Sequence, residues 1–196
     1  MRHIQAELYK ESFLGHTKMM EGKLGQAFNW GLPDKKAIKA IIENPLDQIA
    51  KASLNRKQRE DIRRVLTQGF LQGKGYAQMA RDMKKVYNTR AYEALRIART
   101  EGQKAAVEGQ RQSYERGKEL GIKVKLYWDA FKDNRTRDSH IKMNGVPAEE
   151  KGGELLFFFE ATGQWVTGPM DPALPAEHVI NCRCRLREDI SMEGLS

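Results

Sequence analysis

Through the first 121 residues, apolar positions recur at the three- and four-residue spacing of helices, with glycines and prolines between the runs. This pattern predicts helices over residues 46–71 and 76–83, separated by a glycine-rich break. The longest predicted helix runs from about residue 90 to residue 120. Gly121 provides the C-terminal stop that a helix of this length commonly has.

The longest predicted helix carries mostly small residues along one face. They alternate at spacings of four and three, which places them on one side of a helix: Ala91, Leu95, Ala98, Gly102, Ala105 and Gly109. A face of alanine and glycine lets another backbone approach closely. We therefore expect a neighbouring helix to pack tightly against it.

Beyond Gly121 the hydrophobic period changes from helical spacing to two residues. Residues 122–129 alternate apolar and polar, which is typical of a half-buried strand. The apolar run 155–159 predicts a buried strand, 164–166 a neighbouring one, and 182–187 a final alternating strand. The predicted fold class is α+β: an N-terminal helical region with one long helix, then a small, mostly antiparallel β-rich lobe.

The net charge of +8 is divided unevenly between these two parts. Residues 1–121 contain 24 Lys and Arg against 14 Asp and Glu, whereas residues 122–196 contain 10 against 12. The basic half could attract DNA or an acidic protein surface, although solvated helix faces give the same count. The sequence has no apolar run long enough to cross a bilayer and no apolar secretion signal, so a soluble, cytoplasmically made protein is expected.

The only two cysteines, Cys182 and Cys184, stand one residue apart near the end of the chain. On a strand they would share one face, and three interpretations remain open. They could form a strained disulfide, or pack as small buried hydrophobic residues. They could also bind zinc together with His178 and with His140 from an earlier loop, since these four side chains are ligand types that zinc accepts.

The segment from Asp133 to His140 concentrates charged residues beside a histidine. Such a histidine could act as a general base or a metal ligand, which would suit a nuclease or a transferase. No glycine-rich phosphate loop, nucleophile elbow or paired-carboxylate spacing accompanies it. Arg99 and Glu101 could be solvated charges on the long helix, or they could reach from it toward other segments, for example Asp133 or Arg135.

Taken in order, these motifs resemble the Mu F-like phage head morphogenesis (minor capsid) family over roughly residues 60–187. The resemblance rests on the glycines of residues 69–75, on residues 97–101, on Trp128, on residues 133–140, on Gly145 and on residues 181–184. The motif residues given a structural role by this resemblance are Arg99, Thr100, Glu101, Trp128, Asp133, Arg135, Asn181 and Arg183. Many relatives have Cys-x-x-Cys where this chain has Arg137 and His140, so the chain keeps fewer metal-ligand positions.

The resemblance implies a structural, non-enzymatic minor head protein of a tailed phage or prophage, acting in head morphogenesis or DNA delivery. It would lie inside the virion near the portal, after assembly in the host cytoplasm. Expected partners are the portal protein, other head proteins and double-stranded DNA through the basic helical half, with no membrane. The one cofactor considered is a structural zinc on His140, His178, Cys182 and Cys184.

Two further expectations complete the picture. Residues 1–55 would form an N-terminal helical segment for partner docking, and residues 56–190 the minor head domain, with helices over 56–121 and the β-rich lobe over 122–190. The alternatives to a structural role are a metal-dependent nuclease or transferase effector that uses the Asp133–His140 segment, or a plain DNA-binding module.

Overall fold

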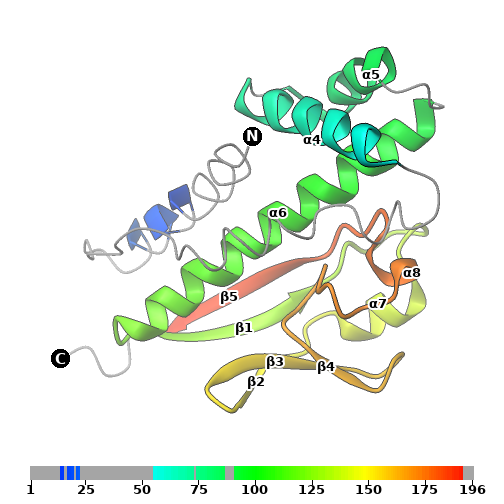
Figure 1. The fold of residues 1–196 in the computed structure, drawn as a ribbon. Helices are drawn as coiled ribbons and strands as arrows, with labels where there is room; N and C mark the ends of the chain where they lie inside the picture. Colours follow the sequence, from blue (N-terminus) through cyan, green and yellow to red (C-terminus); the bar gives the residue numbers. More distant parts are fainter. Residues whose placement is uncertain are drawn as a thin grey trace.

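The computed structural model describes residues 14, 15, 17–19, 21, 22, 55–72, 74–86 and 91–191. The N-terminal segment expected over residues 1–55 lies almost entirely outside these described residues. The remaining chain forms three principal helices and two small antiparallel sheets, which confirms the predicted α+β class with one long helix (Figure 1). None of the described helices is long and apolar enough to span a membrane.

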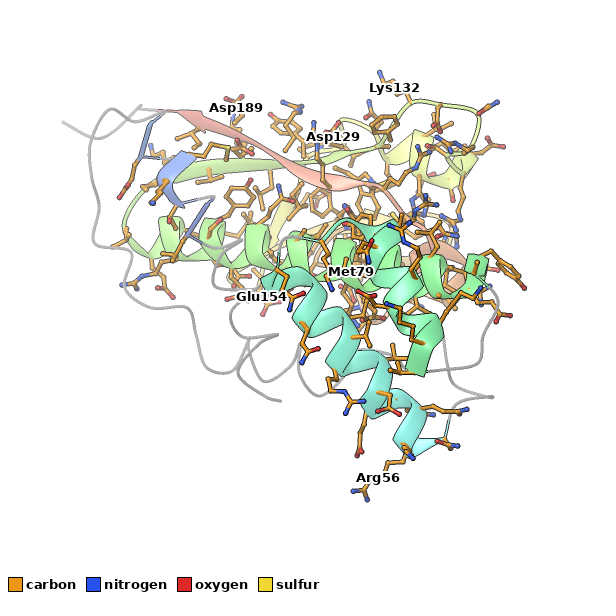
Figure 2. The ribbon with its side chains drawn as sticks, turned by 90° about the horizontal axis from the view of Figure 1, so that it is seen from above. Arg56, Met79, Asp129, Lys132, Glu154 and Asp189 are labelled. Atoms are coloured by element: carbon orange, nitrogen blue, oxygen red, sulfur yellow. The ribbon has the colours of Figure 1, made fainter. Side chains whose placement is uncertain are left out.

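Helix α4 (Arg56–Leu71) packs against α5 (Tyr76–Val86), and α5 packs against the N-terminal half of α6 (Ala91–Glu119). A reciprocal capping box begins α4: Asn55 Oδ1 accepts from Gln58 N and Gln58 Oε1 accepts from Asn55 N, both at 2.9 Å. Apolar side chains of all three helices form one core: Ile62, Val65, Leu66, Met79, Ala80, Met83, Ala94, Ile97 and Ala98. Figure 2 shows Met79 at the centre of this helical cluster and Arg56 at its far tip.

Over part of its length, the small-residue face of α6 packs against a neighbouring helix, as the spacing predicts. Ala98 is fully buried and shares a core with Met79 and Met83 of α5. Gly102 and Gly109 are buried further along the helix. Gly121 then ends α6 at a φ of 83°, and the amide of Ile122 donates to the carbonyl of Gly117, as in a Schellman cap.

The β-rich lobe contains two separate sheets. Strand β1 (Lys123–Asp129) pairs antiparallel with β5 (Arg185–Ser191), so the end of the chain returns along the strand that follows α6 (Figure 1). The second sheet is a meander of β2 (Glu149–Lys151), β3 (Glu154–Phe159) and β4 (Gln164–Val166).

Three details differ from the sequence expectation. Two short helices, α7 (Asp138–Met143) and α8 (Ala176–Val179), occupy segments that the sequence pattern did not identify as helical. The strand expected over residues 182–187 begins only at Arg185, because the chain turns through Asn181, which has a φ of 56°, before it joins β1.

An aromatic core joins the two sheets to the C-terminal half of α6. Trp128 of β1 is fully buried and stacks on Phe159, with ring centroids 5.6 Å apart, while Phe157 meets it edge-on at 5.7 Å. Tyr114 of α6 is also fully buried, and its hydroxyl donates to Glu188 Oε2 at 2.7 Å. Burial, reinforced by Glu188, raises the pKa of Tyr114 far above its usual value, so this hydroxyl stays protonated.

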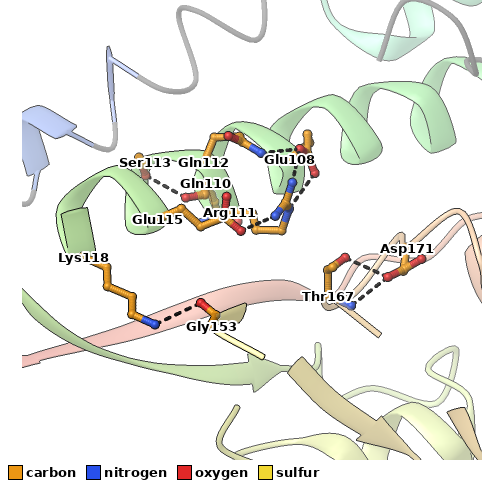
Figure 3. Close-up of polar contacts among 10 residues, drawn as sticks. All are labelled: Glu108, Gln110, Arg111, Gln112, Ser113, Glu115, Lys118, Gly153, Thr167 and Asp171. Carbon is orange, nitrogen blue, oxygen red and sulfur yellow. Dashed lines mark hydrogen bonds and ion pairs between the residues drawn. The ribbon is translucent and has the colours of Figure 1, made fainter. Parts of the chain in front are cut away.

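Polar contacts fix the connections around this core (Figure 3). Lys118, near the end of α6, donates to the carbonyl of Gly153 at 3.1 Å and so holds the turn between β2 and β3. In the loop before α8, Asp171 accepts from both the amide and the hydroxyl of Thr167 at 2.7 Å. Lys118 thus joins the β2–β3 turn to α6, and Asp171 fixes the shape of the loop that follows β4.

The contact between α4 and α5 can be tested at Gly69, where an added Cβ would lie 2.3 Å from Cγ of Met79. We expect Gly69→Ala to destabilise the chain by about 1–3 kcal/mol, because the fully buried Met79 has little room to move. Gly75→Ala is the matched control, since a Cβ there meets nothing within 4 Å. Urea denaturation measures both variants, and equal midpoints would contradict the close contact.

Candidate functional site

The C-terminal segment is joined to the loop after β1 by a two-pronged ion pair. Arg183 Nη1 donates to Asp133 Oδ2 at 2.7 Å and Nη2 donates to Asp133 Oδ1 at 2.5 Å. Arg183 Nη2 also donates to the hydroxyl of Thr136 at 3.1 Å. The Arg183 guanidinium holds the pKa of Asp133 well below its usual range, so the carboxylate is charged at neutral pH.

Neighbouring residues of the same loop add to this junction. The guanidinium of Arg183 lies over the ring of Phe131, 4.9 Å from its centroid. Arg137 Nη2 donates to the carbonyl of Ile180 at 2.6 Å, just ahead of the tail motif. The amide of Arg135 donates to Asp133 Oδ1 at 3.0 Å, while its own side chain remains 76% exposed.

Helix α6 holds the other side of the tail. The hydroxyl of Thr100 accepts from the amide of Asn181 at 3.0 Å and donates to the carbonyl of Arg96 at 2.8 Å. One turn further along, Gln103 Nε2 donates to the carbonyl of Cys184 at 2.8 Å. These two bonds leave the tail backbone fixed against the helix.

The expected reach of Arg99 and Glu101 toward Asp133 or Arg135 needs correction on one point. Asp133 receives its ion pairs from Arg183 and Arg135, and Arg99 is exposed. The residue of this motif that touches the tail is Thr100, because its short side chain lies on the buried side of α6.

Beneath the ion pair, three buried side chains converge. His140 Nδ1 lies 3.3 Å from Cys184 Sγ and 3.6 Å from Cys182 Sγ, and the three ligand atoms all lie within 4.8 Å of one another. Both cysteines are free thiols, so they do not form the disulfide that was one of the three interpretations. His178 stacks on His140 with ring centroids 5.6 Å apart, beside the group of three.

The two thiols differ in acidity. Cys184 has its pKa lowered to about 5, first by a hydrogen bond from Cys182 and then by His140 and Trp128, which together outweigh burial. The pKa of Cys182 is raised instead, because its thiol is hydrogen-bonded to Cys184 and its side chain is buried. Cys184 is therefore the more readily ionised thiol of the pair. Burial and the neighbouring His140 lower the pKa of His178, which leaves that ring neutral.

The donor set and the spacing fit a zinc ion. Usual zinc–nitrogen and zinc–sulfur bond lengths place tetrahedral nitrogen and sulfur ligands about 3.5 Å apart, close to the observed 3.3 and 3.6 Å. A cavity of about 10 Å³ adjoins the cluster, which is room for about one ion or water. Within the described part of the chain, His140 Nε2 and His178 Nδ1 are buried without a hydrogen-bond partner.

Several of the motif residues come together here, namely Thr100, Trp128, Asp133, Asn181 and Arg183, whereas Arg99 and the side chain of Arg135 are exposed. Trp128 meets His140 edge-on, with ring centroids 5.9 Å apart, and forms one wall of the cluster. Sequence reasoning gave no role to three contributors, Gln103, Phe131 and Thr136, and it named Arg137 in the motif without identifying its partner, the carbonyl of Ile180. Of these, Gln103 was recoverable, because it stands three residues after Thr100 and so shares its side of the helix.

Comparison with known proteins gives one family match and two relatives. The family model described as Phage Mu protein F like protein matches residues 60–187. The NAD(+)–arginine ADP-ribosyltransferase EFV of Enterococcus faecalis (strain ATCC 700802 / V583) is 33% identical over 139 residues, which is 70% of this chain and 26% of that protein. The minor head protein GP7 of Bacillus phage SPP1 is 27% identical over 141 residues, 70% of this chain and 46% of that protein.

The chain therefore spans less than half of the length of each of these relatives. No solved structure gives a significant match.

The ion pair gives a pH-dependent prediction for Asp133→Asn. Because the folded-state pKa of Asp133 lies below that of the unfolded chain, the pair stabilises the fold above about pH 4 and less as the pH falls further. We expect the variant to melt a few degrees below wild type at pH 7, with a gap that narrows below about pH 4.

Thermal melts at a series of pH values measure this gap. Asp189→Asn is the matched control, since Asp189 is an exposed aspartate of the same lobe, on β5. A gap between wild type and Asp133→Asn that stays constant down to pH 3 would mean that the ion pair does not stabilise the fold.

Proposed function

The chain belongs to the Phage Mu protein F like family, and we propose that it acts as a structural minor head protein at the portal region inside the virion. In this proposal residues 56–190 are the folded head-protein domain, with helices over 56–121 and the β-rich lobe over 122–190. Residues 1–55 are a segment for docking to a partner. Assembly takes place in the host cytoplasm, and the role is in head morphogenesis or DNA delivery.

One observation carries the structural role: several motif side chains bond to other parts of the same fold. Asp133 binds Arg183, Thr100 binds the backbone at Asn181, and His140 is 1% exposed beside the two cysteines. A substrate would need side chains that it can reach, whereas the cavity at this site has a volume of about 10 Å³, which is far smaller than a ligand pocket. We therefore assign the cluster to joining α6, the loop and the tail.

The enzymatic alternative has less support. The transferase activity belongs to the name of the Enterococcus faecalis relative, and the match covers 26% of that protein. A nuclease or transferase on the Asp133–His140 segment would need His140 or Asp133 to be accessible to a substrate. His140 is buried, and the carboxylate of Asp133 is paired with Arg183.

We assign a structural zinc to the buried cluster, with Cys182, Cys184 and His140 as ligands and His178 as the fourth. The support is the donor set and its geometry: His140 Nδ1 and the two sulfur atoms lie within 4.8 Å of one another, and the pKa of Cys184 is lowered. Bound there, zinc would supply a cross-link between the tail and α7. Its loss would loosen the lobe without removing any reacting group.

We assign portal docking to the basic surface of α4 and α5. Several lysines of this surface are exposed, including Lys57, Lys84 and Lys85. A portal surface rich in carboxylates would attract them. Docking by this surface leaves the β-rich lobe free for other contacts.

The zinc assignment predicts the metal content of the purified protein. Protein prepared without chelator should contain close to one zinc per chain, and Cys184→Ser should contain almost none, because the three ligands that remain lack one of the two sulfur donors and hold the ion far more weakly than four. Elemental analysis measures this, and cobalt substitution should give a thiolate charge-transfer band. Removing zinc with a chelator should lower the melting temperature.

Asp133→Asn is the matched control for metal content, because it lies outside the ligand set and should keep its zinc. His178→Ala should weaken retention of zinc if His178 is the fourth ligand. Zinc well below one equivalent in wild type, even after refolding with added zinc, would contradict the assignment.

The docking proposal predicts capture of the chain by the portal protein encoded beside it. Wild type should co-purify with the portal, and Lys57→Gln/Lys84→Gln/Lys85→Gln should bind about tenfold more weakly, since three attractive charges are lost. Pull-down followed by gel filtration measures both. Absence of any association of wild type under assembly conditions would contradict the proposed function.

A further inference from the structure

The outer face of the β1–β5 ribbon is basic, although the C-terminal part of the sequence is not. Along β1 and its continuation, every second residue points away from the core, and the same holds for β5 and the tail before it. The cations that this alternation places on the face are Lys123, Lys125, Arg183, Arg185 and Arg187, and Lys132 of the loop after β1 lies on the same side (Figure 2). Figure 2 shows Asp129, Lys132 and Asp189 on the side of the ribbon that faces away from α6.

Two of these arginines lie over aromatic rings. Arg187 covers Tyr127 at 4.5 Å from the ring centroid, in the register that pairs these two residues. Arg183 covers Phe131 at 4.9 Å. Between them Arg185 Nε donates to Asp129 Oδ2 at 2.6 Å. The arginines of the tail are therefore held in extended positions along the ribbon, which reduces the entropy that a ligand would have to remove.

The remaining charges of the face are left for a partner. Within the part of the chain that the structure describes, Lys123, Lys125 and Lys132 make no ion pair, and all three are exposed. Four acidic residues lie apart from this face, on and beside the β2–β3–β4 meander: Glu149, Glu150, Glu154 and Glu160. Asp129, Asp133 and Asp189 lie on the face, where the first two are paired with Arg185 and Arg183, so the cations of the face still outnumber its acids.

We propose that this outer face of the β1–β5 ribbon binds the phosphate backbone of double-stranded DNA. That this DNA is the packaged genome rests on the proposed function. The expectation from sequence had placed DNA on the helical half instead. Lys123 and Lys125 are two residues apart on one strand, about 6.7 Å, which is twice the axial rise per phosphate of one DNA strand.

The form of the face favours a duplex over a single strand. A two-stranded ribbon is narrow enough to enter the major groove of DNA. Single strands are held chiefly by bases stacked on exposed aromatic rings, whereas here Tyr127 and Phe131 each have one face covered by an arginine. The surface therefore offers charge to the backbone in preference to stacking platforms for bases.

The test compares two variants of the full chain that lose the same three charges. The ribbon variant is Lys123→Gln/Lys125→Gln/Lys132→Gln, and the helix variant is Lys57→Gln/Lys84→Gln/Lys85→Gln. Binding of a 30-base-pair duplex, in the range of roughly 50–200 mM salt, is measured by fluorescence anisotropy. Capture by the portal protein is measured on the same samples, and thermal melts verify that both variants fold.

We expect the ribbon variant to bind DNA more than about tenfold more weakly than wild type, with a salt slope reduced by about 2–3, while its capture by the portal protein is unchanged. The helix variant should keep its DNA affinity. A wild type that does not bind the duplex overturns the inference, as does equal weakening by both variants or DNA binding lost only in the helix variant.

Two results separate this inference from the proposed function. If the ribbon variant loses portal capture and keeps DNA binding, the ribbon is a protein interface and the inference is overturned, while the head-protein role stands. If wild type binds DNA through the ribbon and shows no portal association, the proposed docking fails and the inference stands.

Discussion

The register between β1 and β5 is the constraint on which the rest of the lobe depends. Trp128 lies opposite Leu186, and both side chains point into the core. Cys184, two residues before Leu186, therefore also points into the core. Because side chains on a strand alternate, a slip of one residue would turn the buried positions outward and bring the arginines in. The contacts of the tail with Asp133, with Thr100 and with His140 all presuppose this one alignment.

Much of this architecture was readable from the sequence, because its elements follow simple periods. The 29-residue helix α6 and strands β1, β3 and β4 appeared where the spacing of apolar residues placed them. The meeting of the tail with the Asp133–His140 segment was also expected. What the sequence could not give was the geometry at atomic range: that Asp133 would take Arg183, and that the helix would reach the tail through Thr100.

The misses have physical causes. Helices α7 and α8 are too short for a helical period to show, and their positions depend on packing. The sequence predicted a zinc site with four ligands. Of these, His140, Cys182 and Cys184 come together, while His178 stacks on His140 beside them. The ribbon charges escaped notice because a sum over residues 122–196 mixes two surfaces that folding sets apart.

The pairing of β1 with β5 also bears on how the chain is made. At least 56 residues separate the partners Asp129 and Arg185, so during synthesis β1 emerges from the ribosome well before β5. The other edge of β1 is bonded by residues 145–148, which follow sooner, but until β5 arrives the edge that it covers is open and could recruit another nascent strand. Lys123 and Lys125 on that strand repel identical chains, and so act as gatekeepers against aggregation in the interval before the chain closes.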